Sequence, residues 1–349
     1  MTIPQRFPRR ITTALLAAAV VSCTLFSGAA AASAATDPDP GGDSASLGAA
    51  VQRIGGADRY ETAAAVSART FDPLVPIVFI ASGEVFTDAL SASAAAGAHG
   101  GAVLLTQKSA LPPATATELT RLKPEQIVVL GGTATIDASV ETALHGYSGT
   151  VTRISGADRF AVSAAVSARS FASSRPVAYV ASGTVFSDAL SGSAAAGRLG
   201  GPVLLVTRDE VPTLIADELR RLAPAKIVVL GGPDTISDAA YSRLQAMAPT
   251  SRVMAADRFG VSAAVSADAF PPGIATVYVA SGSVYSDALA GSAAAIADAG
   301  PVLLVTATSV PAPVRAELDR LHPRRIVVLG GTNSISDATL ESLRGSTRP

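Results

Sequence analysis

The chain contains no tryptophan, one cysteine and three histidines among its 349 residues. The one cysteine, Cys23, lies in an apolar N-terminal stretch, so the sequence from residue 36 onward can form no disulfide, thiolate nucleophile or cysteine-based metal site. The histidines His99, His145 and His322 have no metal-ligand spacing, and no two of them occupy the same place in the repeats described below. We therefore expect neither a metal site nor a repeated Ser–His–Asp triad.

Lysine is also scarce. Lys108, Lys123 and Lys226 are the three lysines, and the other basic residues are arginines. Without residues 1–35 the chain has 24 basic and 28 acidic residues, a net charge of −4. Because a nucleic-acid-binding protein would be strongly basic, nucleic acid is not an expected partner. Arginine is the better residue for forked contacts to phosphate or carboxylate groups.

The first 35 residues are typical of an export signal. Its basic region, apolar core and small-residue cleavage pattern are Arg6 to Arg10, Ile11 to Leu25 and Ser33 to Ala35. The alternatives are a membrane anchor, twin-arginine export through Arg9-Arg10, and lipidation of Cys23. We predict a signal peptide at 1–35, a flexible spacer rich in Pro, Gly and Ser at 36–50, and no membrane contact after cleavage.

The same motifs occur three times. The segments RIGGADRY, RISGADRF and RVMAADRF begin at Arg53, Arg153 and Arg252. Each is followed at a fixed distance by ASG, DAL, VLL and VVLGG segments. A period of about 100 residues is too long for a solenoid unit and suits a small domain. We therefore predict three repeats, at 51–149, 150–249 and 250–345.

Each repeat alternates apolar runs with alanine-rich segments. In the first repeat we expect strands at 51–54, 77–81, 102–105 and 127–130, and helices at 58–69, at 86–96, after Pro112-Pro113 and around 136–144. Asp58 is well placed to cap the first helix. Such alternation predicts an α/β fold: three tandem Rossmann-like or flavodoxin-like domains, each a parallel sheet with helices on both faces.

Polar residues recur where the predicted strands end. Ligands of parallel sheets bind beyond the carboxyl ends of the strands, and the GADR, SGxxFxDAL and LGG loops should share that edge of each domain. The candidate binding residues are Arg59, Arg159, Arg258, Ser82, Ser182 and Ser281. The supporting carboxylates are Asp58, Asp158, Asp257, Asp88, Asp188 and Asp287.

Two interpretations of these residues stay open. In the first, Asp58 only caps a helix, and Arg59 pairs with a carboxylate such as Asp88 across the strand ends. In the second, arginines gathered from three repeats hold an anionic polymer, each oriented by a carboxylate.

Aromatic residues recur in four sets, which predicts core filling rather than sugar stacking. The sets are Tyr60/Phe160/Phe259, Phe71/Phe171/Phe270, Phe79/Tyr179/Tyr278 and Phe86/Phe186/Tyr285.

No catalytic residue, cofactor or metal is expected. Asp58 and Asp88 are the two acids of the repeat that a glycosidase could use as a pair, but three identical small active sites without aromatic platforms would be unusual. Ser82 has no base near it in the sequence. The glycine-containing turns match neither G-x-G-x-x-G nor the P-loop pattern.

Four patterns occur in order in each copy between about Val51 and Gly345: R-[IV]-x-x-A-D-R-[YF], [FY]-[IV]-A-S-G-x-[VF]-[FY]-[ST]-D-A-L, G-x-V-L-L and I-V-V-L-G-G. With these motifs the chain resembles the cell wall-binding repeat 2 proteins of Gram-positive bacteria. The resemblance implies three modules around a pseudo-threefold axis, which bind an anionic, teichoic-acid-like wall polymer without covalent bonds in grooves between neighbouring repeats. It implies a secreted, wall-associated surface protein.

In many proteins of this family the repeats are attached to an effector domain, and here the signal, spacer and repeats occupy the whole sequence. An effector partner would then be a separate protein. The alternatives are a secreted peptidoglycan hydrolase, an amidase-associated wall-remodelling protein, or a binder of small solutes. The copies also differ: Met254-Ala255-Ala256 replaces Gly55-Gly56-Ala57, and Glu84 becomes Thr184 and Ser283.

Overall fold

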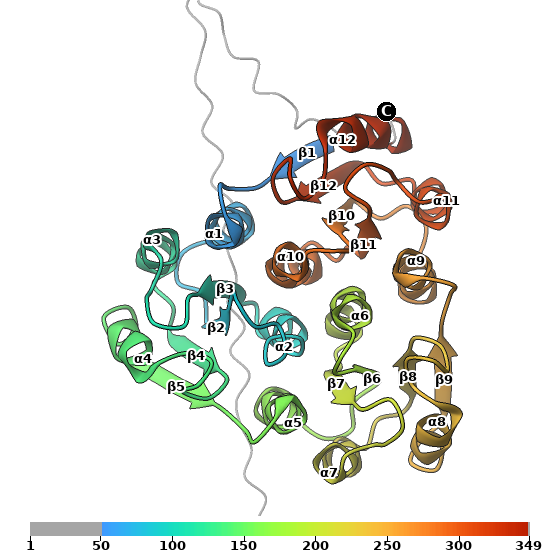
Figure 1. Ribbon diagram of the computed structural model, residues 1–349, viewed down its shortest axis with the longest axis horizontal. Coiled ribbons are helices and arrows are strands. Elements are labelled where there is room, and N and C mark those ends of the chain that lie inside the picture. The colour runs from blue at the N-terminus through green and yellow to red at the C-terminus, as the bar shows by residue number, and fades with distance from the viewer. Residues whose placement is uncertain (1–50, 348–349) are drawn as a thin grey trace, which may run out of the picture. The chain divides into compact units, whose positions relative to one another are not determined.

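Twelve strands form three parallel four-stranded sheets in the computed structural model, which describes residues 51–347 (Figure 1). The predicted signal peptide at 1–35, with Cys23, and the predicted spacer at 36–50 lie outside the described residues. Between residues 51 and 347, every helix is too short or too polar to span a bilayer.

Each sheet has its strands out of sequence order. The first sheet runs β3 (Ala102–Thr106), β2 (Ile77–Ser82), β4 (Gln126–Leu130), β5 (Thr150–Ile154). The second runs β7 (Val203–Val206), β6 (Ala178–Ser182), β8 (Ile227–Leu230), β9 (Thr250–Val253). The third runs β1 (Val51–Ile54), β12 (Arg325–Leu329), β10 (Thr276–Ser281), β11 (Val302–Val305).

The helices fall into four sets, with one member from each repeat. The first two sets are α1 (Arg59–Thr70), α5 (Arg159–Ser170) and α9 (Arg258–Ala269), then α2 (Ala92–Ala98), α6 (Phe186–Arg198) and α10 (Tyr285–Ala297). The other two are α3 (Pro113–Leu122), α7 (Thr213–Leu222) and α11 (Ala312–Leu321), then α4 (Ala138–Leu144), α8 (Asp238–Gln245) and α12 (Asp337–Leu343), followed by the 3₁₀ turn Arg344–Ser346. The predicted α/β class and parallel sheets are confirmed.

The strand that opens each sequence repeat belongs to the sheet of the preceding one. β5 pairs with β4, β9 pairs with β8, and β1 pairs with β12, so the first described strand completes the third sheet. Our expectation that the strands of one repeat form one sheet is therefore wrong. The reason is the short connection after α4: the helix ends at Leu144 and β5 begins at Thr150, so the chain returns directly beside β4.

The inner strands are buried on both faces, which explains their continuous apolar runs. All six residues of β2 are buried, and Phe79, Tyr179 and Tyr278 are at most 1% exposed. Core filling is confirmed for this aromatic set and for Phe71, Phe171 and Phe270.

Three helices, α2, α6 and α10, pack against one another at the centre of the three repeats (Figure 1). Their alanine, glycine and serine residues are small enough to allow this close approach. The Ser93 hydroxyl donates to Leu289 O (2.8 Å), that of Ser193 to Leu90 O (3.3 Å) and that of Ser292 to Leu190 O (3.1 Å). Each repeat thus donates to the one before it in a closed cycle, and the predicted pseudo-threefold arrangement is confirmed.

The helix expected at 86–96 begins later than predicted. In repeat 1 the regular helix starts at Ala92, whereas α6 and α10 start at Phe186 and Tyr285, the counterparts of Phe86.

Candidate binding site at the repeat junctions

The carboxyl ends of the strands bring together polar loops of two successive repeats. Each GADR turn follows a strand of the preceding repeat's sheet, so it lies beside the LGG turn of that repeat. We name the three places by the repeats they join. Junction 1/2 has Asp88, Gly131 and Arg159; junction 2/3 has Asp188, Gly231 and Arg258; junction 3/1 has Asp287, Gly330 and Arg59.

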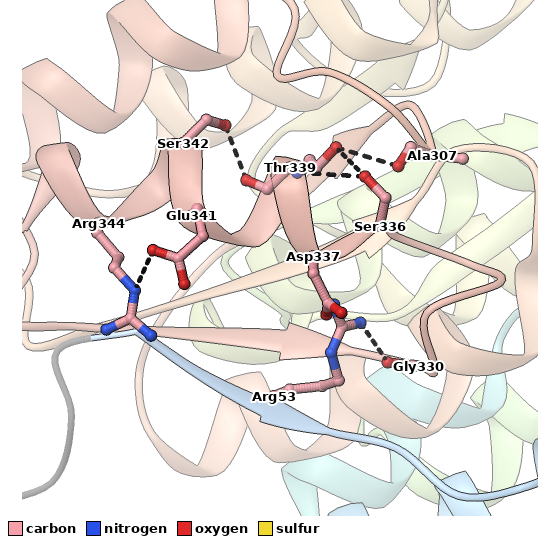
Figure 2. Close-up of polar contacts among 9 residues, drawn as sticks. All are labelled: Arg53, Ala307, Gly330, Ser336, Asp337, Thr339, Glu341, Ser342 and Arg344. Atoms are coloured by element: carbon pink, nitrogen blue, oxygen red, sulfur yellow. Dashed lines mark hydrogen bonds and ion pairs between the residues drawn. The ribbon is translucent and has the colours of Figure 1, made fainter.

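An arginine that the sequence analysis left without a role fixes each junction. At junction 3/1, Arg53 Nη1 donates to Gly330 O (2.9 Å) and Nη2 pairs with Asp337 at the start of α12 (3.1 Å), as Figure 2 shows. Arg153 does the same with Gly131 O and Glu141, and Arg252 with Gly231 O and Asp238. The signal was present in the sequence, because this arginine opens every copy of the first motif.

The first glycine of each LGG turn has a left-handed backbone, with φ of +95° or +96°. A Cβ on Gly231 would lie 2.8 Å from Asp188 Oδ2, and one on Gly131 would lie 2.5 Å from Asp88 Oδ2. Glycine is thus required both by the conformation and by the carboxylate packed against it. The DAL aspartate and the LGG turn of one repeat form the floor of each junction.

The DAL aspartates of repeats 2 and 3 are deeply buried, with Asp188 4% and Asp287 3% exposed. Burial raises the pKa of Asp188, and the hydrogen bond from Ser187 and the positive charge of Arg258 oppose the rise. Burial likewise raises the pKa of Asp287, opposed by Ser334, Ser286 and the charge of Arg59. In both cases the arginine that acts on the carboxylate comes from the next repeat.

The GADR arginines lie at the surface. Arg59 and Arg258 are exposed and Arg159 is half-buried. Arg59 Nη1 donates to Gly83 O of its own repeat, and Arg258 makes the equivalent bond to Gly282 O (2.6 Å). In the interpretation that pairs Arg59 with a carboxylate across the strand ends, the example of Asp88 is wrong: because β1 joins the third sheet, the carboxylate that Arg59 faces is Asp287.

Junction 2/3 contains a pocket of about 150 Å³. Asp188 and the Gly231-Gly232 turn line one side, and Asp257 and Arg258 line the other. The two acids in this pocket thus come from different repeats. By the same topology Asp58 and Asp88 belong to different junctions, so the carboxylate pair considered for a glycosidase is not brought together.

The aspartates of the ADR motif cap helices, as predicted for Asp58. Asp58 Oδ1 accepts from Tyr60 N and Glu61 N, both at 2.8 Å. Asp158 accepts from Ala161 N and Asp257 from Gly260 N, at 2.9 and 2.8 Å. All three side chains remain exposed beside the adjacent arginine.

The candidate serines are buried beneath their loops. Ser82, Ser182 and Ser281 are at most 2% exposed. Each hydroxyl accepts a backbone N–H of the loop that follows; Ser82, for example, accepts from Glu84 N and Val85 N at 3.1 Å. These hydrogen bonds hold the loops in place. A role of the serines in ligand contact stays a prediction.

One aromatic set lies at the margin of the core, between the repeats. Phe86, Phe186 and Tyr285 are half-buried and meet one another where the three repeats converge, with ring centroids 5.5 to 6.2 Å apart. Arg258 lies over the Phe186 ring at 5.8 Å, and Tyr285 Oη donates to Gly83 O (2.7 Å). These rings pack against the core while staying partly accessible, so core filling describes only part of their role.

The histidines occupy the C-cap positions of three helices, at the opposite edge of the sheets. His99 follows α2 and lies 3.1 Å from Ser170 O, while His145 and His322 end α4 and α11. The junctions instead combine guanidinium groups, carboxylates and backbone amides. Such a set can hold a ligand that carries anionic groups and hydroxyls.

Comparison with known proteins identifies related sequences. The model of the family "Cell wall binding domain 2" matches residues 53–141, 153–241 and 252–340. The amidase enhancer of Bacillus subtilis (strain 168) is 28% identical over 301 residues, which is 84% of this chain and 40% of that protein. The N-acetylmuramoyl-L-alanine amidase LytC of the same strain is 24% identical over 294 residues, 84% of this chain and 58% of LytC. The chain thus spans about half the length of these curated relatives.

Two solved structures share the fold. Cwp6 from Clostridium difficile superposes with a TM-score of 0.81 and 24% identity, covering 86% of this chain and 48% of Cwp6. Cwp8 from Clostridium difficile superposes with a TM-score of 0.77 and 22% identity, covering 85% of this chain and 51% of Cwp8.

Proposed function

The chain belongs to the cell wall binding domain 2 family, and from this premise we propose that it is an exported, non-catalytic protein that binds an anionic, teichoic-acid-like polymer of the wall. The polymer contacts are at the three junctions. Arg59, Arg159 and Arg258 donate charge-assisted hydrogen bonds to its phosphate or carboxylate groups.

One observation carries this proposal: at all three junctions the topology brings a GADR arginine to the strand ends of the preceding repeat, and at junctions 2/3 and 3/1 that arginine acts on the DAL carboxylate there. The carboxylate serves two ends. Its negative charge attracts the guanidinium, and at junction 2/3 it lines a pocket in which a hydroxyl of the polymer can donate to it. A site of mixed charge favours a polymer with both anionic groups and hydroxyls over a simple salt.

Three linked junctions raise residence on the wall beyond that of one. Each contact is weak and screened by salt, but a polymer held at one junction meets the next at high effective concentration.

Because two relatives bear the names amidase enhancer and amidase, the partner we infer for this chain is a separate wall amidase that shares the same polymer.

The test compares two double variants that remove the same charge. Arg59→Gln/Arg258→Gln changes two junctions, whereas Arg69→Gln/Arg169→Gln changes exposed arginines in the last turns of α1 and α5, at the other edge of the sheets. Sedimentation with purified Bacillus subtilis walls gives the affinity. We expect the junction variant to lose at least about tenfold and the control less than about twofold.

Two results would contradict the proposal. Equal losses in the two double variants would mean that net charge alone drives binding. Undiminished binding to walls whose phosphate polymers have been removed by acid would rule out the anionic polymer.

A further inference from the structure

Repeat 1 departs from the other two repeats beside its junction aspartate. In repeats 2 and 3 the DAL segment forms the first turns of α6 and α10, whereas the regular helix of repeat 1 starts at Ala92. The segment before it is a series of tight turns, with Ala89 N donating to Phe86 O (3.1 Å) and Ala92 N to Ala89 O (2.9 Å). These are i→i+3 bonds, which are shorter-range than those of an α-helix.

The repeats differ by a single methyl group at the residue where the helix of repeat 1 begins. The counterparts of Ala92 are Gly192 and Gly291, and a Cβ at either glycine would overlap the side chain of the leucine that ends the adjacent strand, Leu230 or Leu329. Leu130 is the equivalent residue in repeat 1 and is fully buried. A helix that started at Phe86, as α6 and α10 start at the equivalent residues, would bring the Ala92 methyl against Leu130 in the same way; the regular helix of repeat 1 starts at Ala92 instead.

The other difference within this segment is Thr87, where the other repeats have Ser187 and Ser286. Threonine and serine have similar helix propensities, so this change is a weak effect beside a steric overlap. It provides a control for the test below.

The displaced segment changes junction 1/2. Asp88 is half-buried, whereas Asp188 and Asp287 are at most 4% exposed. The hydrogen bonds to the three carboxylates are of similar length: Asp88 accepts from Thr87 at 3.4 Å and Thr135 at 3.3 Å, Asp188 from Ser187 at 3.2 Å, and Asp287 from Ser286 at 3.5 Å. The difference therefore lies in burial and in the backbone that carries the aspartate. Ser193 and Ser292 bond back to the fourth residue before them at 2.7 Å, and the bond that Ser93 makes is to Leu289 O of repeat 3.

We propose that Ala92 makes junction 1/2 the weakest of the three wall-binding junctions, so that junctions 2/3 and 3/1 hold most of the polymer. This inference rests on the proposed function. The physical reason is preorganisation: a junction whose carboxylate stands on irregular backbone must be ordered by the ligand, and that ordering opposes binding. Ala92 is thus a positioning residue that acts through Asp88.

The first test is Ala92→Gly, with Thr87→Ser as its matched control. Hydrogen exchange followed by mass spectrometry reports on the helix: the amides of 89–92 should gain protection in Ala92→Gly and not in Thr87→Ser. Affinity for Bacillus subtilis walls should rise about threefold in Ala92→Gly, and the gain should vanish when Arg159→Gln is added. The reverse change, Gly192→Ala, should lower wall affinity.

The second test ranks the arginines singly. Arg159→Gln should reduce wall affinity less than Arg59→Gln or Arg258→Gln. If Arg159→Gln costs as much as the others, or if Ala92→Gly protects the helix while wall affinity stays unchanged, the inference about junction 1/2 falls and the proposed function stands. If none of the three arginine variants weakens binding, the proposed function falls as well.

Discussion

The two edges of the three sheets are built differently. At the carboxyl edge the same residue types occupy equivalent places in every repeat: an ADR turn, a DAL aspartate and an LGG turn. At the amino edge the equivalent places differ. Three such sets, in repeat order, are Arg69/Arg169/Asp268, His99/Leu199/Asp298 and Gln126/Lys226/Arg325.

Each pair of neighbouring repeats is also joined by different chemistry at the amino edge. His99 meets Ser170 O between repeats 1 and 2, and Arg198 lies 5.1 Å over the Phe270 ring between repeats 2 and 3. A small pocket with Arg69 and Arg325 lies between repeats 3 and 1. At the amino edge the side chains only hold neighbouring repeats together, and many combinations of residues can do that. At the carboxyl edge the same residues recur in every repeat, as expected of a surface that binds the same ligand three times.

The largest effect on stability should come from replacing a glycine with positive φ at the carboxyl edge, compared with one at the amino edge. Gly231 and Gly200 both have positive φ in repeat 2, but Asp188 packs against Gly231 and nothing lies near Gly200. Alanine in a left-handed conformation costs about 1–2 kcal/mol at either site. Gly231→Ala should cost about 1–3 kcal/mol more, because its methyl meets the carboxylate.

Urea unfolding of the two variants measures this difference directly. Gly200→Ala is the control for backbone strain alone. Equal free energies of unfolding would mean that the Asp188 carboxylate moves aside freely, and that the carboxyl edge is no more tightly built than the amino edge.

Local features of the fold were predictable from the sequence. The pairing of each repeat's first strand with the sheet of the preceding repeat was not. Apolar runs marked the inner strands, and Asp58 was identified as a helix cap from its residue type and position. The sequence periodicity showed three equal units but not that β1 would lie in the third sheet. That choice depends on how a short connection returns beside β4, and it decides that Arg59 faces Asp287 rather than Asp88.

A second prediction concerns the central helices α2, α6 and α10, at a position near the amino edge where repeat 3 differs from the other two. Ile296 stands where repeats 1 and 2 have Gly97 and Gly197, and a Cβ on either glycine would overlap its side chain. Gly197→Ala should therefore destabilise the protein by about 1–3 kcal/mol, although alanine is the better helix former.

A double-mutant cycle with Ile296→Ala gives the check. In the Ile296→Ala background the added methyl has room, so Gly197→Ala should be neutral or stabilise by about 0.5–1 kcal/mol. Additive effects of the two substitutions would show that Ile296 does not fill the space of the glycines.

The smallest effect contrasts two aspartates of repeat 3 at opposite edges. Asp287 Oδ2 is buried without a hydrogen-bond partner, and burial raises the pKa of this carboxyl above its ordinary value of 3.8. Asp298, by contrast, accepts from Arg325 (2.6 Å) and Tyr278 Oη (2.9 Å). Asp287→Asn should therefore remove a buried charge, and Asp298→Asn should break an ion pair.

The pH dependence distinguishes the two. A carboxyl whose pKa is raised by folding binds more protons in the folded than in the unfolded state, so it lowers stability as pH rises from about 4 through the folded pKa. The free energy of unfolding of Asp287→Asn should thus increase relative to the parent over that window, whereas Asp298→Asn should lose up to about 1 kcal/mol at pH 7. Urea unfolding at several pH values measures the free energies of unfolding of both variants and the parent. A parallel loss in both variants would mean that Asp287 is stabilised as an anion by its junction, and that the two edges treat a carboxylate alike.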